Sequence, residues 1–182
     1  MDTLDCIYNR RSIRNFTSEP VSHETLEKII EAASFAPSWK NTQVVRYIAI
    51  DDSELIQKIA KNCTSTFVYN GNTIGKAPML IAITALKGRS GVERDGSFTT
   101  DRKDTWMMFD SGCAAQTFCL AASAYDLGTV IMGIFDDDKI SSLLNIPSDR
   151  ELINLICIGH PAEAPEAPKR KAVSDLLSYF SK

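Results

Sequence analysis

Residues 10–14 of this sequence, Arg-Arg-Ser-Ile-Arg, are the first group whose types and spacing suit ligand chemistry. In an extended conformation, Arg10, Ser12 and Arg14 point to one side of the chain, and Ile13 points to the other side. Two guanidinium groups and a hydroxyl on one side suit a phosphorylated, polyhydroxylated ligand. A solvated basic turn after a short helix explains these residues about equally well.

Residues 36–43, Ala-Pro-Ser-Trp-Lys-Asn-Thr-Gln, form a second polar group between a predicted helix and a predicted strand. Loops of this kind present hydrogen-bond donors and acceptors to a heteroaromatic ring. A capped connection with Trp39 over the core is the simpler explanation of this loop taken alone.

The third group is the basic tripeptide Lys169-Arg170-Lys171, which follows a proline-rich segment near the C-terminus. Cations tethered after a stiff arm can neutralise a phosphate of charge near −2. Basic tails are more often solvent-exposed, so this segment alone indicates little.

Composition excludes several classes of function. The formal net charge of −3 gives no general attraction to nucleic acid or to an anionic membrane. The N-terminus lacks an apolar signal segment, and no apolar run is long enough to span a bilayer. Five cysteines without a CxxC pair, and two histidines without a partner at ligand spacing, predict reduced thiols in the cytoplasm and no metal site.

Hydrophobic periodicity predicts the elements that hold the first two groups. Ser22 should cap a helix over residues 22–34, whose apolar residues recur on one face, and Pro37 should stop it. Residues 44–50 have the pattern of a strand, and Asp52 can cap the next helix.

The rest of the chain continues this alternation. An apolar run after Pro78 predicts a strand buried on both faces, and residues 87–100 predict a polar loop. A long helix rich in small residues should run from about Asp104 to Leu127, with Gly128 as its stop. A helix capped by Asp136 and a strand over 152–158 should follow. We therefore expect one α+β domain over residues 1–182, with residues 160–182 as a C-terminal extension.

Taken in order, these segments resemble the nitroreductase family over nearly the whole chain, from about Cys6 to the end. The matching segments are RRSIRNF, APSWKNTQ, the small-residue helix, GIFDDDKISSLLNIP, and IGHPAE followed by PKRK. The resemblance implies an α+β fold with a central mixed sheet flanked by helices. It also implies an intertwined homodimer with one FMN in each subunit interface.

The resemblance assigns the cations to two parts of the flavin. Arg10 and Ser12, with Arg11, would hold the FMN phosphate and ribityl chain, and Arg14 would lie near the pyrimidine edge of the ring. A cation there stabilises the negative charge of the reduced ring. Two terminal cations, Lys169 and Arg170, would close over the phosphate.

The remaining matched residues would surround the ring. Asn70 would contact the flavin, and the backbone of Gly133 and Ile134 would lie near flavin N5. Some family members carry Glu-Gly before Phe-Asp at this point, so the substrate preference of those members does not carry over. The other subunit would border the ring with four residues: Pro37, Ser38, Asn41 and Gln43.

The implied activity is an oxidoreductase in which flavin N5 takes hydride from NADH or NADPH and passes it to electron-poor acceptors, such as nitroaromatics or quinones, by a ping-pong mechanism. No catalytic side chain is implied. No Gly-rich dinucleotide fingerprint follows a strand, so the sequence does not choose between the two donors. A reductive dehalogenase on the same fold, a non-catalytic FMN carrier or sensor, and a phosphate-ester binding module remain alternatives.

Overall fold

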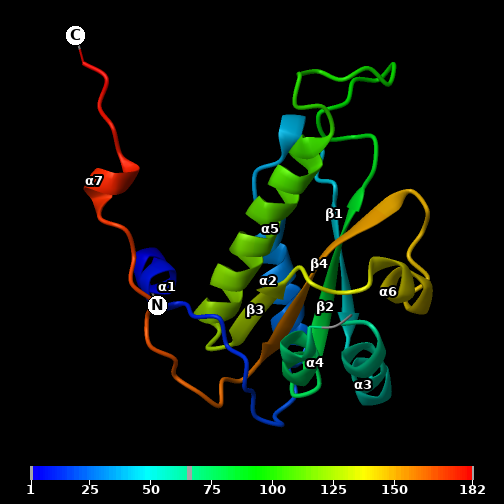
Figure 1. The fold of residues 1–182 in the computed structure, drawn as a ribbon, viewed down its shortest axis with the longest axis vertical. Coiled ribbons are helices and arrows are strands. Elements are labelled where there is room, and N and C mark those ends of the chain that lie inside the picture. The colour runs from blue at the N-terminus through cyan, green and yellow to red at the C-terminus, as the bar shows by residue number, and fades with distance from the viewer. Residues whose placement is uncertain (1, 65–66, 182) are drawn as a thin grey trace.

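A four-stranded sheet lies between two layers of helices in the computed structural model, which describes residues 2–64 and 67–181 (Figure 1). The strands lie in the order β1-β2-β4-β3, so β1 and β3 form the two edges. All three strand pairings are antiparallel. The strands are β1 (Val45–Ile50), β2 (Met79–Leu86), β3 (Gly128–Met132) and β4 (Arg150–Gly159).

Helices cover both faces of the sheet (Figure 1), and because the sheet is antiparallel the fold is α+β. One face carries α2 (His23–Ser34) and α5 (Thr105–Ala124). The other carries α3 (Ser53–Asn62), α4 (Val68–Ile74) and α6 (Asp137–Leu143). Three short helices complete the described chain: α1 (Thr3–Asn9), the 3-10 helix η1 (Trp39–Asn41) and α7 (Val173–Leu176).

The core consists of two apolar layers that share the central strands. Alternate residues of β2 enter opposite layers, with Leu80 packing toward α3 and Ile81 packing toward α2 and α5. Neither residue has any exposed surface. The expectation of a strand buried on both faces after Pro78 is therefore confirmed.

The predicted helix caps are confirmed at three positions. The Ser22 hydroxyl accepts a hydrogen bond from the N–H of Thr25, and Asp52 accepts hydrogen bonds at the start of α3. Asp136 accepts one from the N–H of Lys139 at the start of α6. Each cap satisfies a backbone donor that the first turn of a helix leaves free.

The prediction that Gly128 stops the long helix is wrong. α5 ends at Ala124, and Asp126 adopts the left-handed conformation after it, with φ of 58°. Gly128 instead begins β3, where a Cβ atom would lie 2.6 Å from Cγ1 of Ile13. Its missing side chain lets the N-terminal segment approach the strand.

The sheet also differs from the mixed sheet that we expected, because its named strands pair only in the antiparallel sense. Parallel pairing occurs at one isolated bridge, between Ser12 and Thr129. The N–H of Ile13 donates to the carbonyl of Thr129 at 3.0 Å. Residues 10–14 thus lie along the outer edge of β3.

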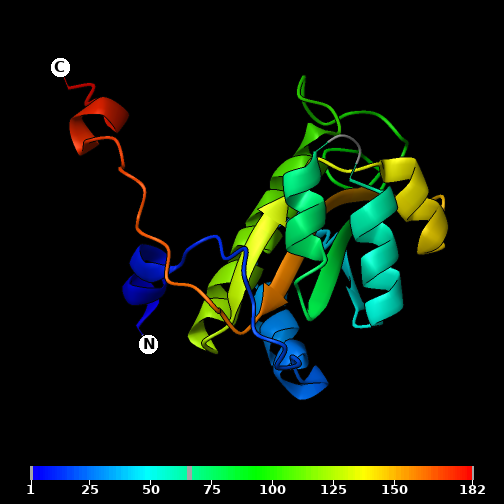
Figure 2. The same cartoon turned by 60° about the horizontal axis from the view of Figure 1, so that its bottom comes forward.

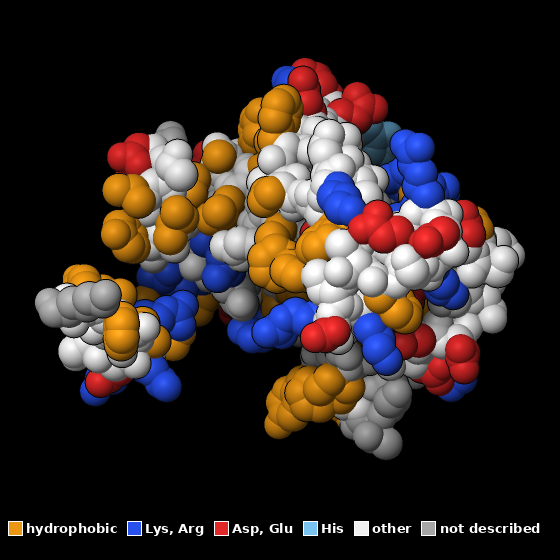
Figure 3. Space-filling model, turned by 90° about the horizontal axis from the view of Figure 1, so that it is seen from above, with side chains coloured by type: hydrophobic (Ala, Val, Ile, Leu, Met, Phe, Trp, Pro, Cys, Tyr) orange, Lys and Arg blue, Asp and Glu red, His pale blue; other side chains and the backbone are white. Residues whose placement is uncertain are grey.

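Beyond β4 the chain leaves the sheet, passes α1 and ends in an arm that carries α7 (Figure 2). Apolar side chains lie on this arm, apart from the body of the domain (Figure 3). Those of Leu176, Leu177, Tyr179 and Phe180 are exposed. Within the described part of the chain, no helix is long and apolar enough to cross a membrane.

Candidate functional site

Residues 10–14 lie beside β3 with alternate side chains on opposite sides. Ile13 is buried and packs over Gly128, whereas Arg14 is exposed. Ser12, which precedes Ile13, is paired with Thr129. This alternation is the one predicted for an extended segment, and it aims the polar residues away from the core.

Arg10 carries an unsatisfied donor at the start of this segment. Its Nε atom is buried and has no hydrogen-bond partner among the residues that the structure describes. Arg10 and Arg11 line a cavity of about 340 Å³, whose other walls include Gly128, Pro161 and residues 163–165. A buried guanidinium donor beside a cavity fits an anionic ligand such as a phosphate.

Glu163 ties the C-terminal part of the chain to residues 10–14. Its carboxylate accepts hydrogen bonds from the N–H of Arg14 at 2.6 Å and from the N–H of Asn15 at 3.2 Å. The side-chain amide of Asn15 donates to it at 2.5 Å. The backbone hydrogen bond from Arg14, followed by that from the Asn15 side chain, lowers the pKa of Glu163.

The other end of β3 carries a second group of polar and aromatic residues. The side-chain amide of Asn70 donates to the carbonyl of Ile134 at 2.9 Å. Gly133 precedes Ile134, and Phe67 and Tyr69 lie beside Asn70 with their ring centroids 5.5 Å apart. This group lies just beyond the C-terminal end of β3, which ends at Met132.

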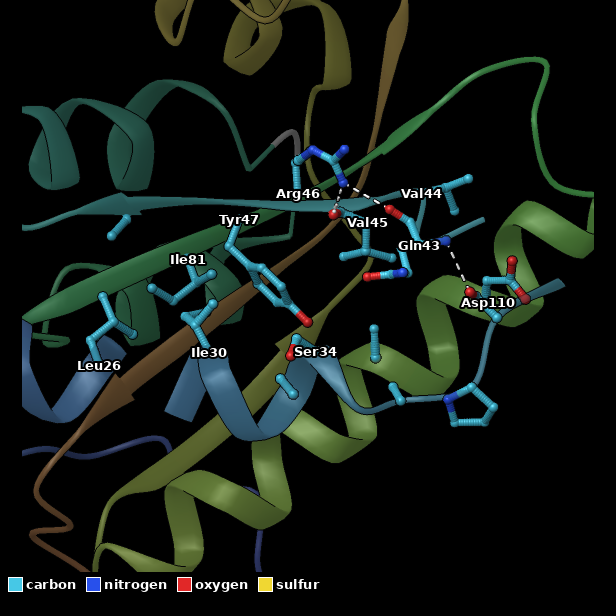
Figure 4. A pocket seen from close by; sticks show the side chains of 16 residues that line it. Leu26, Ile30, Ser34, Gln43, Val44, Val45, Arg46, Tyr47, Ile81 and Asp110 are labelled. Atoms are coloured by element: carbon cyan, nitrogen blue, oxygen red, sulfur yellow. Dashed lines mark hydrogen bonds between the residues drawn. The ribbon is translucent and has the colours of Figure 1, made fainter. Parts of the chain in front are cut away.

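The loop of residues 36–43 lies elsewhere, at the start of β1. Pro37, Ser38 and Gln43 line a cavity of about 410 Å³ between α2, β1 and α5 (Figure 4). The N–H of Gln43 donates to the hydroxyl of Ser38 at 2.9 Å, which closes the loop. Asn41 is exposed within it.

One chain therefore does not bring all the predicted site residues together. Residues 10–14, Asn70, Gly133 and Ile134 lie along β3, whereas residues 36–43 lie at β1. These strands are opposite edges of the sheet, three strand spacings or about 14 Å apart. Lys169 and Arg170 are exposed on the C-terminal arm.

Three of the five thiols are poor candidates for nucleophiles. Burial raises the pKa of the Cys119 and Cys157 thiols, and it also raises the pKa of Cys63. These side chains are therefore protonated near neutral pH. Within residues 2–64 and 67–181, no three His, Cys, Asp or Glu side chains gather where they could hold a metal ion.

Two residues of structural importance were absent from the predicted site. Glu163 lies within the HPAE segment that carried the family resemblance, and this location could have marked it as a site residue. Asp110 is buried on α5 and accepts hydrogen bonds from the N–H of Trp39. The sequence could have pointed to Asp110 as well, because it is the only charged residue in α5.

Most of the chain is similar in sequence to known proteins of one family. The nitroreductase family model matches residues 7–73 and 67–160. The FMN reductase [NAD(P)H] of Bacillus subtilis is 30% identical over 193 residues, covering 99% of this chain and 75% of that protein.

Solved structures extend this likeness to the fold. A putative nitroreductase in complex with FMN from Desulfovibrio desulfuricans is 28% identical, with a TM-score of 0.77 and coverage of 100% and 98% of the two chains. Another from Exiguobacterium sibiricum, also in complex with FMN, has a TM-score of 0.84 at 21% identity, covering 99% of this chain and 98% of that one.

Proposed function

This chain belongs to the nitroreductase family, and we propose that it is an FMN-dependent oxidoreductase that carries hydride from NAD(P)H to electron-poor small molecules such as nitroaromatics or quinones. Its relatives include proteins named as an NADPH-flavin oxidoreductase and an FMN reductase. The observation that carries the proposal is the buried Nε of Arg10, which has no hydrogen-bond partner among the described residues and belongs to a side chain lining a cavity near the start of β3.

The phosphate end of the cofactor would lie at the start of β3. Arg10 and Arg11 face a common cavity there, and Ser12 supplies a hydroxyl from the adjacent paired position. Glu163 also lines this cavity, but its carboxylate already accepts hydrogen bonds from the N–H groups of Arg14 and Asn15. The unpaired N–H donor of the Arg10 guanidinium is thus available to an anion.

The ring would lie toward the far end of the same strand. Bound FMN supplies the redox chemistry, accepting hydride from NAD(P)H and passing it to the acceptor. Asn70 is oriented by its hydrogen bond to Ile134, which fixes the backbone beside Gly133. Arg14, which is exposed, would stabilise negative charge on the ring. Trp39, Phe67 and Tyr69 would shape the slot that donor and acceptor occupy in turn.

We propose further that the active form is a homodimer. Residues 36–43 lie about 14 Å across the sheet from β3, so a second subunit would bring its own Pro37, Ser38, Asn41 and Gln43 against the ring. The exposed apolar arm supports such an exchange, because side chains like Phe180 gain stability only when covered. Lys169 and Arg170, on the same arm, would close over the phosphate.

Two organisational proposals complete this description. Residues 1–182 would act as one domain with residues 160–182 as its extension, which agrees with a family match that ends at residue 160. The enzyme would work in the cytoplasm, where NAD(P)H is available and its five free cysteines stay reduced.

The direct test is the visible absorption spectrum of the purified protein, recorded anaerobically before and after addition of NADH or NADPH. Flavin bands that bleach would establish the activity and identify the donor. Flavin bands that persist with both donors would favour a carrier or sensor. A protein without flavin bands after reconstitution with FMN would overturn the proposal.

A further inference from the structure

The loop that borders the proposed ring site is held in an unfavourable backbone conformation. Lys40, Asn41 and Gln43 have positive φ angles of 45°, 57° and 47°. Residues with side chains rarely adopt this left-handed region, and three such residues within four positions require support from the surrounding structure.

Asp110 supplies that support from α5. Its side chain is 3% exposed. Each of its two carboxylate oxygens lies 3.0 Å from the backbone nitrogen of Trp39, which donates to them. One oxygen also accepts from the hydroxyl of Ser90 at 2.7 Å. The carboxylate therefore joins the strained loop to the start of the polar loop 87–104.

Further contacts link loop 38–43 with loop 87–104 and with the first turn of α5. The ring centroids of Trp39 and Trp106 lie 4.6 Å apart, and the Lys40 ammonium lies 2.6 Å from the Glu93 carboxylate. The Trp106 indole N–H donates to the Thr100 hydroxyl at 2.9 Å. Loop 87–104 thus contacts loop 38–43 through the Lys40–Glu93 ion pair and the shared carboxylate of Asp110, while Trp106 at the start of α5 packs against Trp39.

We propose that Asp110 is a positioning residue that holds loop 38–43 in the shape that contacts the flavin, with loop 87–104 as its brace. The proposal rests on the proposed function, in which this loop borders the ring in the partner site. Asp110 lies at the end of the cavity that Ser38 and Gln43 also line (Figure 4). It acts through the loop backbone, because its oxygens are engaged by Trp39 and Ser90.

The two tryptophans of the chain provide a readout of loop position that does not require flavin. Indole rings this close couple their transitions, so circular dichroism of the full chain should show an exciton couplet in the ultraviolet. Trp106→Phe assigns that couplet to the pair. The variants to compare are Asp110→Asn, which keeps the volume but places an amide donor near the N–H of Trp39, and Asp110→Ala, which removes both acceptors.

Asp104→Asn is the matched control, because Asp104 is exposed at the start of the same helix and makes no capping hydrogen bond. We expect Asp110→Asn to weaken the couplet and to raise the Kd for FMN about tenfold or more, since charge-assisted hydrogen bonds are lost. Asp110→Ala should have the larger effect, and the visible circular dichroism of the flavin that remains bound should change.

A purely structural role gives a different result. Asp110→Asn would then lower thermal stability while leaving the couplet, the FMN Kd and the flavin spectrum unchanged, and this outcome would overturn the proposal. Where both Asp110 variants fail to fold, Ser90→Ala removes one partner of the carboxylate without changing α5, and the same readouts apply. Failure of the wild-type chain to bind FMN would refute the proposed function, while the couplet would still report whether Asp110 positions the loop.

Discussion

Single residues at the two ends of the chain depend on one another through hydrogen bonds. Glu163, near the C-terminus, accepts the N–H groups of Arg14 and Asn15 near the N-terminus. The cations of residues 10–14 are therefore presented by a segment that a distant carboxylate holds in place. Substitutions at either end should change cofactor binding without disturbing the core.

Arg14→Ala should weaken FMN retention without unfolding the protein. Arg14 is exposed, and its guanidinium makes one long hydrogen bond, of 3.3 Å, to the Ser12 carbonyl. Loss of one charge-assisted contact to the ring should raise the FMN Kd about tenfold. Flavin occupancy after dialysis measures this effect. Lys61→Ala removes the same charge from the exposed surface of α3 and serves as the control; unchanged occupancy in Arg14→Ala would contradict the assignment.

Glu163→Gln should reveal a pH-dependent contribution to stability. Because hydrogen bonds lower the pKa of Glu163 in the folded state, its stabilisation is fully present above the ordinary carboxyl pKa of about 4.3. It is lost as the pH falls from there through the lowered pKa. The difference in unfolding free energy between wild type and Glu163→Gln should therefore be constant near neutral pH and shrink in acid.

Urea unfolding at several pH values measures this difference, and Glu166→Gln is the matched control because Glu166 is exposed three residues further on. A difference that grows as the pH falls would reverse the expected sign. At neutral pH, Glu163→Gln should also raise the FMN Kd, about tenfold by the loss of charge-assisted hydrogen bonds.

Among the elements, β3 depends on the close approach of the N-terminal segment. A Cβ atom on Gly128 would lie 2.6 Å from Cγ1 and 2.8 Å from Cβ of Ile13. Gly128→Ala should therefore lower the unfolding free energy by about 1–3 kcal/mol, as overpacking usually does. It should also loosen the pairing of Ser12 with Thr129.

Chemical unfolding and amide exchange at Ile13 measure both effects. Combining Gly128→Ala with Ile13→Ala should cost less than the sum of the single changes, because the nearest colliding atom, Cγ1 of Ile13, is then absent. Gly75→Ala is the control, since a Cβ there would have ordinary contacts of 3.4 Å or more. Additive costs would show that the two residues do not compete for space.

Elements with strong local signals could be predicted from the sequence. Ser22, Asp52 and Asp136 cap helices as expected, because a side-chain cap and the apolar period are both local features. α4 escaped the prediction, since its sequence, VYNGNTI, has weak periodicity and Gly71 within it. That glycine is explained only by tertiary packing, because a Cβ would lie 2.6 Å from the Ala60 carbonyl on α3.

Some features of the candidate site could also be predicted from the sequence, and others could not. The direction of Arg14 and Ile13 follows from strand alternation, and the family resemblance supplied the residues beside them. The left-handed conformations of Lys40 and Gln43 could not be predicted, because nothing in their residue types favours positive φ strongly. They depend on contacts from residues such as Asp110 and Glu93, which lie far away in the sequence.

For the whole molecule, the C-terminal arm should govern association. Deletion of residues 171–182 removes exposed apolar side chains such as Leu176 and Phe180, but it removes no residue of the buried core. We expect the truncated chain to lose only the helical signal of the four-residue α7 and to shift toward monomer. Sedimentation velocity across a concentration series measures this shift; a truncated chain that sediments like the full chain would argue against the arm as a subunit contact.

The position of β1 and β3 at opposite edges of the sheet has a genetic consequence. In a dimer whose sites each combine β3 of one subunit with loop 36–43 of the other, Arg14→Ala and Asp110→Ala damage different halves of a site. Mixed dimers of these two defective chains then carry one site with both lesions and one with neither. Random exchange of subunits should restore full FMN affinity to about one quarter of the sites, so two alleles that each weaken FMN binding should complement each other.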